Sequence, residues 1–288
     1  MDFPIEYLKD NEFPRLLREI PSPPKELNYR GAIPSPETKL LAVVGSRHYT
    51  NYGKQVTDYL LAGLRGHNIG IVSGLALGID SLAHEAALTN DLYTLAIPGG
   101  GISDQTIYPA RHKPLARKIL EKGGGLLSEF APDFRATTWS FPQRNRLVCG
   151  ISHATLIIEA SEKSGTLITA KLTADYNREL LVVPGNIFSD NSKGVHQFMK
   201  LGATPVTEPK DILDVLGLEV KSEAPRAKPA ALSAEESRVL EILTAPLERD
   251  TLIRQIGLPI SAATVILMQM ELAGHIVESN GTYRKNYG

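Results

Sequence analysis

Aromatic and basic side chains alternate in one short stretch of the chain, from Trp139 to Arg146. The stretch reads WSFPQRNR, which sets two rings beside two arginines and an asparagine. Aromatic rings stack on unpaired bases at about 1 to 3 kcal/mol each, and arginines hold phosphates. The stretch therefore favours single-stranded nucleic acid over a small apolar substrate. The alternative is that its rings are core residues and its arginines form internal ion pairs.

Short loops rich in glycine supply a second kind of chemistry, the binding of anions by backbone amides. Each loop follows an apolar run, where glycine lets backbone N–H groups approach a ligand closely. Arg47 adds a planar fork suited to bidentate phosphate contact. For its loop, an ordinary turn with a solvated arginine is the alternative. The candidate loops are Gly45-Ser46-Arg47, Ser73-Gly74, Gly99-Gly100 and Ser164-Gly165-Thr166.

The segment between Asp104 and Arg146 is basic, although the whole chain is nearly neutral. It holds eight Lys or Arg against four Asp or Glu, whereas the 288 residues together hold 31 basic and 32 acidic side chains. Arg111 and Lys113 begin this segment, just after the third glycine loop. Nucleic-acid binding would therefore depend on a local basic patch. A solvated helix face is the alternative for such a charge run.

Metal, redox and membrane chemistry find little support. Asp80 and His84 lie four residues apart and would share a helix face, but a capping aspartate with a satisfied histidine is favoured over a metal or acid–base pair. A single cysteine, Cys149, excludes an intrachain disulfide and leaves no second thiol for zinc. We expect no metal and no cofactor. Without an apolar run of about 18 residues or a signal peptide, we also expect a cytoplasmic protein and no membrane partner.

The elements that must position these residues alternate between strands and helices. Amphipathic stretches at 55–66 and 79–88 follow the first two strands, and the pattern predicts a parallel sheet covered on both faces. Ligands of such sheets bind beyond the carboxyl ends of the strands. The five apolar strands are expected at residues 40–44, 69–72, 92–97, 154–158 and 180–183.

The last part of the chain predicts a winged helix-turn-helix domain. A capping box of Ser233 and Glu236 opens one helix, a second spans 249–256, Ser261 caps a third through Leu272, and an Asn-Gly hairpin follows at 276–283. Residues 233–288 carry five basic and seven acidic side chains, and the third helix has no basic residue. Phosphate neutralisation and guanine readout are therefore both missing there. We expect protein contact or a weak accessory role, with sequence-specific duplex binding less favoured.

Four segments are expected along the chain. A lead-in segment covers residues 1–38 and a DNA-binding core covers 39–218. A linker rich in proline, alanine and charge covers 219–231, and the winged helix covers 232–288.

Seven motifs in this order and spacing resemble the DNA-processing protein A (DprA/Smf) family. They are VGSRHYTNYG, SGLALGIDSLAHEAAL, IYPARH, LLSEF, FPQRNRLVCGIS, IIEASEKSGTLITA and VVPGNI. The resemblance implies an α/β fold, an extended Rossmann-like and mostly parallel sheet with helices on both faces, plus the small winged-helix domain. It also implies a homodimer that binds single-stranded DNA and loads the RecA recombinase during natural transformation, without catalysis. The N-terminal helical domain of many members is expected to be absent.

The resemblance also implies roles for individual residues. Gly45-Ser46-Arg47 would be the phosphate-binding loop and Phe141 the ring that stacks on a base. Ser164-Gly165 and Arg144-Asn145-Arg146 would line the same groove. Thr138 departs from the lysine that members often carry three residues before the phenylalanine, so one phosphate contact is lost or is supplied by Arg111 or Lys113.

Self-association is expected on the stretch 194–202, which also is a candidate for contact with RecA. Ordinary core packing is the alternative there. The candidate contact residues are His196, Phe198, Met199 and Leu201.

Two other functions remain open. A nucleotide-processing hydrolase of the lysine-decarboxylase-like type would carry the signature PGGxGTxxE, but Gly101-Ile102-Ser103-Asp104 follow Pro98-Gly99-Gly100, so its catalytic set is incomplete. A transcription regulator would read duplex DNA through the winged helix, which the acidic third helix disfavours.

Overall fold

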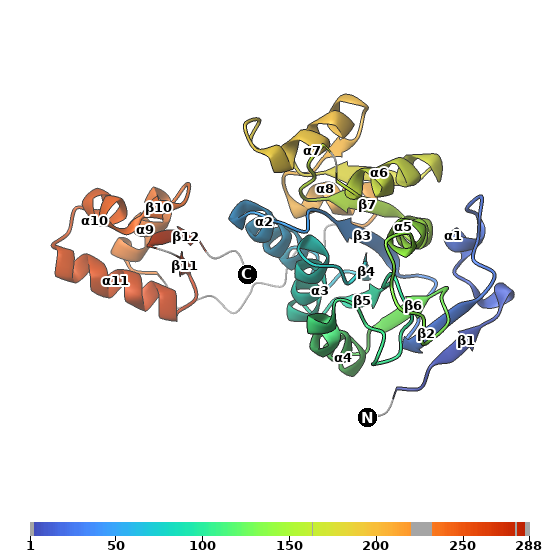
Figure 1. The fold of residues 1–288 in the computed structure, drawn as a ribbon. Coiled ribbons are helices and arrows are strands. Elements are labelled where there is room, and N and C mark those ends of the chain that lie inside the picture. Colours follow the sequence, from blue (N-terminus) through green and yellow to red (C-terminus); the bar gives the residue numbers. More distant parts are fainter. Residues whose placement is uncertain (1–2, 163, 220–231, 280, 286–288) are drawn as a thin grey trace. The chain divides into compact units, whose positions relative to one another are not determined.

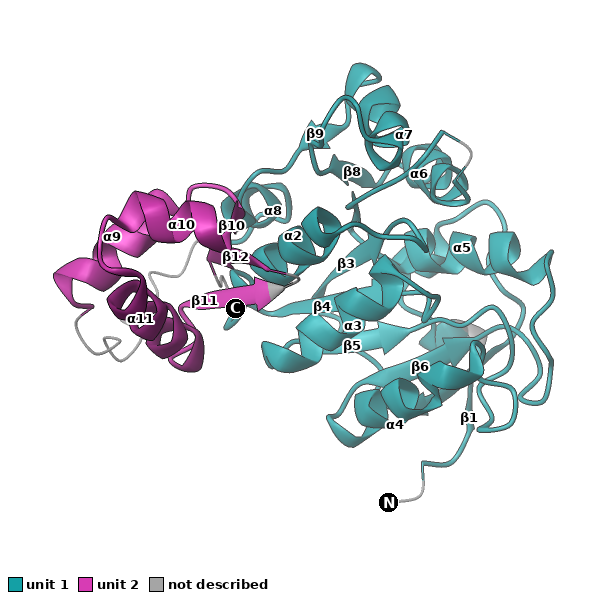
Figure 2. Ribbon diagram, turned by 60° about the vertical axis from the view of Figure 1, so that its left-hand side comes forward, with its two compact units in different colours: residues 1–221 teal, residues 222–288 magenta. Residues whose placement is uncertain are grey.

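The computed structural model describes residues 3–162, 164–219, 232–279 and 281–285. The chain divides into two compact units, residues 1–221 (unit 1) and 222–288 (unit 2), shown in different colours in Figure 2. The boundaries predicted at residues 38, 218 and 231 stay predictions.

Unit 1 is built on one mixed sheet, with nine strands among its described residues in the order β1-β2-β6-β5-β4-β3-β7-β8-β9. The strands from β3 to β9 run parallel to one another, whereas β2 pairs antiparallel with β6 and β1 pairs antiparallel with β2. The strands are β1 Glu6–Leu8, β2 Leu27–Gly31, β3 Lys39–Val44, β4 Ile69–Ser73, β5 Tyr93–Ala96, β6 Gly125–Ser128, β7 Ala154–Ile157, β8 Glu179–Val182 and β9 Thr204–Pro205.

All five predicted strands are confirmed, and they form the centre of the sheet as β5-β4-β3-β7-β8. The four additional strands, β1, β2, β6 and β9, lie to either side of these five. Because β3 pairs with β4 on one side and with β7 on the other, the chain order reverses between β3 and β7. Ligands of open α/β sheets bind outside the carboxyl ends of the strands at such a reversal.

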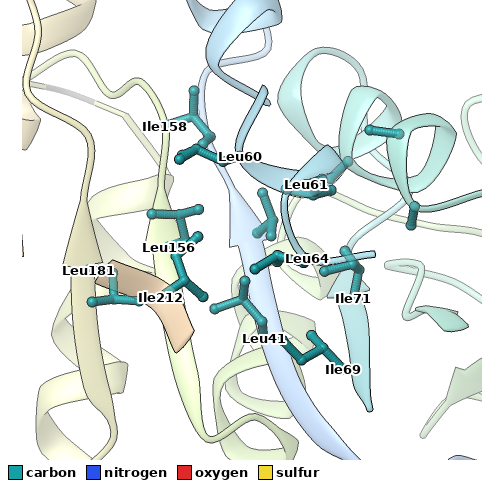
Figure 3. Close-up of a cluster of buried hydrophobic side chains, with 14 of the residues drawn as sticks. Leu41, Leu60, Leu61, Leu64, Ile69, Ile71, Leu156, Ile158, Leu181 and Ile212 are labelled. Atoms are coloured by element: carbon teal, nitrogen blue, oxygen red, sulfur yellow. The ribbon is translucent and has the colours of Figure 1, made fainter. Parts of the chain in front are cut away.

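Helices cover both faces of the sheet, as Figure 1 shows. Alternate residues of β3 point to opposite faces, so Leu41 and Val43 join one buried cluster while Leu40, Ala42 and Val44 join the other. The first cluster packs α2 Asn51–Ala62, α3 Ile79–Thr89 and α8 Pro209–Val215, and Figure 3 shows its leucines and isoleucines. The second packs α1 Arg15–Arg18, α5 Ser140–Ile151, α6 Thr166–Asp175 and α7 Asp190–Lys200. A third cluster lies beneath α4 Lys113–Glu121, and the short 3-10 turns are η1 Asp10–Glu12 and η2 Ala110–His112.

The first helix begins earlier than predicted. The sequence predicted 55–66, but α2 spans Asn51–Ala62 because Thr50 caps it, its Oγ1 accepting a hydrogen bond from the Gly53 amide at 3.2 Å. The second predicted helix, 79–88, agrees with α3 to one residue.

Unit 2 is a winged helix. It contains α9 Ala234–Ile242, β10 Leu247–Glu248, α10 Arg249–Ile256, α11 Ile260–Leu272, β11 Ile276–Ser279 and β12 Thr282–Lys285, with the strands ordered β10-β12-β11. The predicted capping box is confirmed, because Ser233 and Glu236 exchange hydrogen bonds of 2.7 and 3.1 Å. The predicted cap at Ser261 is wrong: α11 begins at Ile260, after Pro259, without a side-chain cap. Asn280 of the predicted turn and residues 220–231 of the predicted linker lie outside the described residues.

The predicted fold class is confirmed by this mostly parallel sheet with its helices and by the winged helix. Within the described ranges no single helix is long and apolar enough to cross a membrane; the pair α10 and α11 passes that test only jointly, with a bend of 111° between them.

Candidate nucleic-acid interface

A cavity of about 490 Å³ lies at the carboxyl ends of β3 and β7, where the strand order reverses. Four chain segments line it: the loop after β3, the loop after β4 with the start of α3, the segment 138–145 that opens α5, and the loop after β7 with the start of α6. Nine of the predicted site residues meet here although their positions span 122 residues of sequence. They are Gly45, Ser46, Arg47, Phe141, Arg144, Asn145, Ser164, Gly165 and Thr166.

A cation and an aromatic ring form the centre of the cavity. The Arg47 guanidinium carbon lies 5.3 Å from the centroid of the Phe141 ring, within the range of a cation–π contact. A second ring, that of Tyr108, lies 5.8 Å from Phe141 at an angle of 45° and is 56% exposed. Gly99 lies against Phe141, since a Cβ at this glycine would come within 2.5 Å of the ring. The two predicted partners of a nucleotide, a phosphate binder and a stacking ring, therefore lie side by side.

Glu159 holds the Arg47 loop from the neighbouring strand. This carboxylate lies two residues beyond Ile157, the end of β7, and is 3% exposed. It accepts hydrogen bonds from the amide and the hydroxyl of Thr50 at 2.9 and 2.5 Å. Gly53 makes room for it, because a Cβ there would lie 2.4 Å from Glu159 Oε2. The sequence analysis missed this residue; the signal was an acid at the end of a fully apolar strand.

The loop after β7 brings polar groups and a helix start to the cavity. Ser164 Oγ donates to Thr166 Oγ1 at 2.9 Å and accepts from the Thr166 amide at 3.2 Å. Gly165 borders open space, since a Cβ there would meet nothing within 4 Å. The positive end of the α6 dipole adds to the preference for an anion at this side of the cavity.

Arg144 has a structural role that the sequence analysis did not assign. It is 4% exposed, and its guanidinium donates to the carbonyl oxygens of Gly74 and Ile97, at the ends of β4 and β5. Burial lowers the pKa of Arg144, whereas the nearby charge of Asp80 raises it. Gly74 contributes space for this guanidinium, because a Cβ there would lie 2.2 Å from Arg144 Nη1. The residue borders the cavity, but its Nη1 donates to these two carbonyl oxygens and its Nε donates to Asn145 Oδ1 at 3.1 Å.

Arg146 lies outside the cavity and forms an internal ion pair, which was the alternative interpretation of the stretch 139–146. Its guanidinium pairs with Glu129 and donates to the Ser22 carbonyl oxygen at 2.6 Å. Burial raises the pKa of Glu129, and the charge of Arg146 acts in the opposite direction. Arg144 and Arg146 are two residues apart on α5, so their side chains leave the helix in different directions.

The other predicted residues also lie outside the cavity lining. Ser73 is buried and donates to the Val43 carbonyl oxygen at 2.7 Å. Gly100 packs against residues 134–136. Arg111 and Lys113 are exposed, and Lys113 lines a separate cavity of about 450 Å³ together with Arg30. Gly74 and Gly99 contact Arg144 and Phe141, as described above.

Thr138 and Trp139, which are adjacent in the chain, differ in placement. Thr138 lines the cavity, at the position where the family resemblance leads one to expect a lysine. Trp139, 54% exposed, packs its edge against Phe130 and Phe134 with ring centroids 5.8 and 5.7 Å away. The tryptophan thus belongs to an aromatic cluster beside the cavity.

Asp80 and His84 are both buried on α3. The prediction that Asp80 caps this helix is wrong, because the N-cap is Gly78; Asp80 Oδ2 instead accepts from the Gly74 amide at 3.1 Å. Burial raises the pKa of Asp80, while the charges of Arg144 and Arg47 lower it. His84 Nδ1 lies 2.7 Å from Thr94 Oγ1, and burial lowers the pKa of His84 to about 3. The described residues contain no group of three metal-ligating side chains.

The predicted self-association residues lie on and just after α7. Phe198 and Met199 pack partly against the core, as the alternative interpretation expects. His196 Nε2 lies 3.1 Å from the Gly185 carbonyl oxygen. Leu201 is 79% exposed and is free to contact another surface.

Comparisons with known proteins agree with this architecture. The family model described as DNA recombination-mediator protein A matches residues 5–217, and the DprA winged helix domain matches 223–282. Protein Smf of Escherichia coli K12 is 36% identical over 286 residues, which cover 95% of this chain and 75% of that protein. The DNA processing protein DprA of Streptococcus pneumoniae is 35% identical over 211 residues, which cover 73% of each protein.

Two solved structures share the fold of unit 1. The X-ray structure of DprA from Streptococcus pneumoniae aligns with a TM-score of 0.68 at 34% identity, covering 74% of each chain. DNA processing protein A from Helicobacter pylori, solved for its single-stranded DNA binding mode, aligns with a TM-score of 0.65 at 30% identity. That alignment covers 74% of this chain and 96% of that one.

The different placement of two arginines predicts different effects on stability. Arg144→Ala removes a buried guanidinium and leaves two carbonyl oxygens without a partner, so the free energy of unfolding should fall by about 3 to 5 kcal/mol. Arg47→Ala removes an exposed side chain and should change the free energy of unfolding by no more than about 0.5 kcal/mol. Urea denaturation followed by circular dichroism measures both. Equal stabilities of the two variants would contradict the structural role of Arg144.

The buried histidine predicts a loss of stability in mild acid. Unfolded His84 takes up a proton below its usual pKa of 6.5, but the folded protein does so only near a pKa of about 3. Protonation therefore favours the unfolded chain as the pH falls, by about 2 kcal/mol between about pH 7.5 and pH 5. His84→Gln should lose this part of the pH dependence in urea titrations at both pH values. An unchanged pH dependence in the variant would overturn the assignment.

Proposed function

Because the chain belongs to the DNA recombination-mediator protein A family, we propose that it binds single-stranded DNA in the cavity at the ends of β3 and β7. The observation that carries the proposal is the pairing of the Arg47 guanidinium with the Phe141 ring, 5.3 Å apart, at the reversal of the strand order. A nucleotide offers both a phosphate and a ring, and the cavity has a partner for each.

Phosphate binding is assigned to the Arg47 side of the cavity. Arg47 is exposed, and its loop is held in place by the bonds between Glu159 and Thr50. A guanidinium that is already positioned loses little side-chain entropy when it takes a phosphate. The α6 N-terminus and the hydroxyls of Ser164 and Thr166 lie across the same cavity and suit the sugar–phosphate backbone.

Base stacking is assigned to Phe141. Its ring is half-buried and is fixed on one side by Gly99. Rings stack on bases of any sequence, so this contact would select unpaired DNA without selecting its sequence. Thr138 stands at the cavity rim and supplies no positive charge, so phosphate binding here depends more heavily on Arg47.

The bound strand would be handed to a recombinase. The family is described as a recombination mediator, and relatives of this chain are named DNA processing proteins. We infer that a homodimer in the cytoplasm protects incoming single strands and loads RecA onto them during transformation or recombination, without a catalytic step of its own. The stretch 194–202, with exposed Leu201, is the surface proposed for self-association or RecA contact.

DNA binding predicts distinct effects for the two central residues. Arg47→Ala should weaken binding of labelled oligo-dT and reduce the salt slope by about 0.7, one single-strand phosphate. Phe141→Ala should weaken binding at least about 5-fold while the slope stays the same, because stacking releases no counterions. Fluorescence anisotropy across a salt series, with a matched duplex beside the single strand, measures both.

Arg117→Ala is the matched control. Arg117 is an exposed arginine on α4, paired with Glu121, and its loss should leave oligo-dT binding unchanged. If the single strand does not bind, or if both cavity variants bind like the wild type, the proposed function is wrong. Release of free base from a nucleoside monophosphate would instead support the hydrolase.

The winged helix is proposed to contact protein. Its helix α11 carries no Lys or Arg and exposes apolar side chains at spacings of three to five residues. Ile260, Val265, Met268 and Leu272 are 72%, 55%, 59% and 84% exposed. An apolar stripe of this kind suits a protein partner and offers nothing to phosphates.

Two glutamate substitutions on this stripe distinguish a winged helix that binds protein from one that reads duplex DNA as a transcription regulator. Met268→Glu with Leu272→Glu should reduce the amount of RecA that the full-length protein retains in a pull-down, because charge is placed on an apolar contact. Anisotropy with single-stranded and duplex oligonucleotides should not change. A loss of duplex binding in this variant, or sequence-dependent duplex binding by the wild type, would favour the transcription regulator.

A further inference from the structure

Two loops meet beside the cavity at the carboxyl edge of the sheet. The Tyr52 hydroxyl, on α2, donates to the Pro184 carbonyl oxygen at 2.6 Å, just after β8. Asn191 Nδ2, on α7, donates to the His48 carbonyl oxygen at 2.8 Å. These bonds join the loop after β3 and the start of α2 to the loop after β8 and the start of α7, so these segments are held together across the end of β7.

Aromatic and apolar side chains are exposed on these joined segments. Tyr49 and Tyr52 are 42% and 44% exposed, and Ile187 and Phe188 are 71% and 87% exposed. The backbone that presents Phe188 is itself hydrogen-bonded, because the Phe188 amide donates to Asn186 Oδ1 and the Ser189 amide to the Asn186 carbonyl oxygen, both at 2.9 Å. A large apolar side chain held in solvent by a bonded loop indicates a binding surface.

The surface begins where the cavity ends. His48 lines the cavity, and Tyr49 follows it directly in the chain. The Cα atoms of Arg47 and Tyr49 are at most about 7 Å apart, the reach of two extended residues. A strand whose phosphate contacts Arg47 therefore has the Tyr49 ring within reach of a neighbouring nucleotide.

We propose that the single strand leaves the cavity past His48 and stacks further bases on an aromatic ledge formed by Tyr49, Tyr52 and Phe188. This inference rests on the proposed function, because it extends the same bound strand. Three rings suit unpaired bases because every base has a face that stacks on them, whatever the sequence. Ile187 adds apolar surface beside Phe188. The ledge thus extends the cavity's binding site along the bound strand and is not a second, separate site.

The length of the oligonucleotide separates the ledge from the cavity. Oligo-dT of about 4 nucleotides would fill the cavity alone, whereas about 16 nucleotides would also reach the ledge. Tyr49→Ala and Phe188→Ala should each weaken binding of the longer strand at least about 5-fold, leave the shorter strand unaffected and keep the salt slope. Phe141→Ala should weaken both. Anisotropy with the full-length protein measures all of these.

One control variant and one altered strand sharpen the test. Tyr7→Ala removes a tyrosine that is 57% exposed on β1, and it should have no effect. A longer strand with abasic sites outside the cavity should bind wild type and the Tyr49→Ala, Phe188→Ala double variant equally, because the ledge then has no bases to hold.

The outcomes distinguish failure of the ledge from failure of the proposed function. If the wild type binds neither strand, the proposed function itself fails. If it binds both and the ledge variants match it on the longer strand, the ledge is wrong and the cavity stands. Ledge variants that change the oligomeric state in size-exclusion chromatography, with unchanged DNA affinity, would show that a second copy covers this surface and would also overturn the ledge.

Discussion

The buried guanidinium of Arg144 is the contact on which the candidate site depends. It joins α5 to the carboxyl ends of β4 and β5 through the carbonyl oxygens of Gly74 and Ile97. Phe141 lies three residues earlier on the same helix, so the position of the ring follows from the position of the arginine. Removing a charge from water is costly, and the opposite charge of Asp80 nearby offsets part of that cost. Arg144 thus positions the Phe141 ring, and Arg47 lies over that ring.

A second buried charge places Arg47 itself. Glu159 lies two residues beyond the end of β7 and accepts hydrogen bonds from the amide and the hydroxyl of Thr50 in the loop after β3. Since β3 and β7 are neighbours only because the strand order reverses between them, this carboxylate bridges the reversal. Both charged residues serve the fold: Arg144 lines the cavity, and Glu159 anchors the loop that carries Arg47. Arg47 and Phe141 line the same cavity and remain available to a ligand.

The two units combine different surfaces in one chain. Unit 1 presents a cation, rings and hydroxyls at one sheet edge, which together suit an unpaired strand. Unit 2 has the helices and wing of a duplex reader, but its α11 exposes apolar side chains and carries no base-reading arginine. The winged-helix fold alone does not assign its function, so the proposed protein contact rests on the apolar surface of α11.

Much of this architecture was already determined by the order of residues. Apolar runs at 40–44, 69–72, 92–97, 154–158 and 180–183 predicted the five central strands, because strands buried on both faces are continuously apolar. The capping box at Ser233 and the glycine loops at strand ends have local causes, so the sequence shows them directly. The motifs placed Arg47 and Phe141 at one site. The polar strand β2, which lies between β1 and β6, and the two-residue β9 lack such a pattern, and only pairing with their neighbours makes them strands.

Only the tertiary structure decided which charged residues serve the fold and which remain available. Arg47, Arg144 and Arg146 have the same chemistry, yet one is exposed over a ring, one is buried under two strand ends, and one pairs with Glu129. The helix period of 3.6 residues sends neighbouring side chains in different directions, and their partners come from strands distant in sequence. Asp80 met the Gly74 amide instead of capping its helix for the same reason. Burial and partners depend on how the elements pack, and a local sequence pattern contains neither.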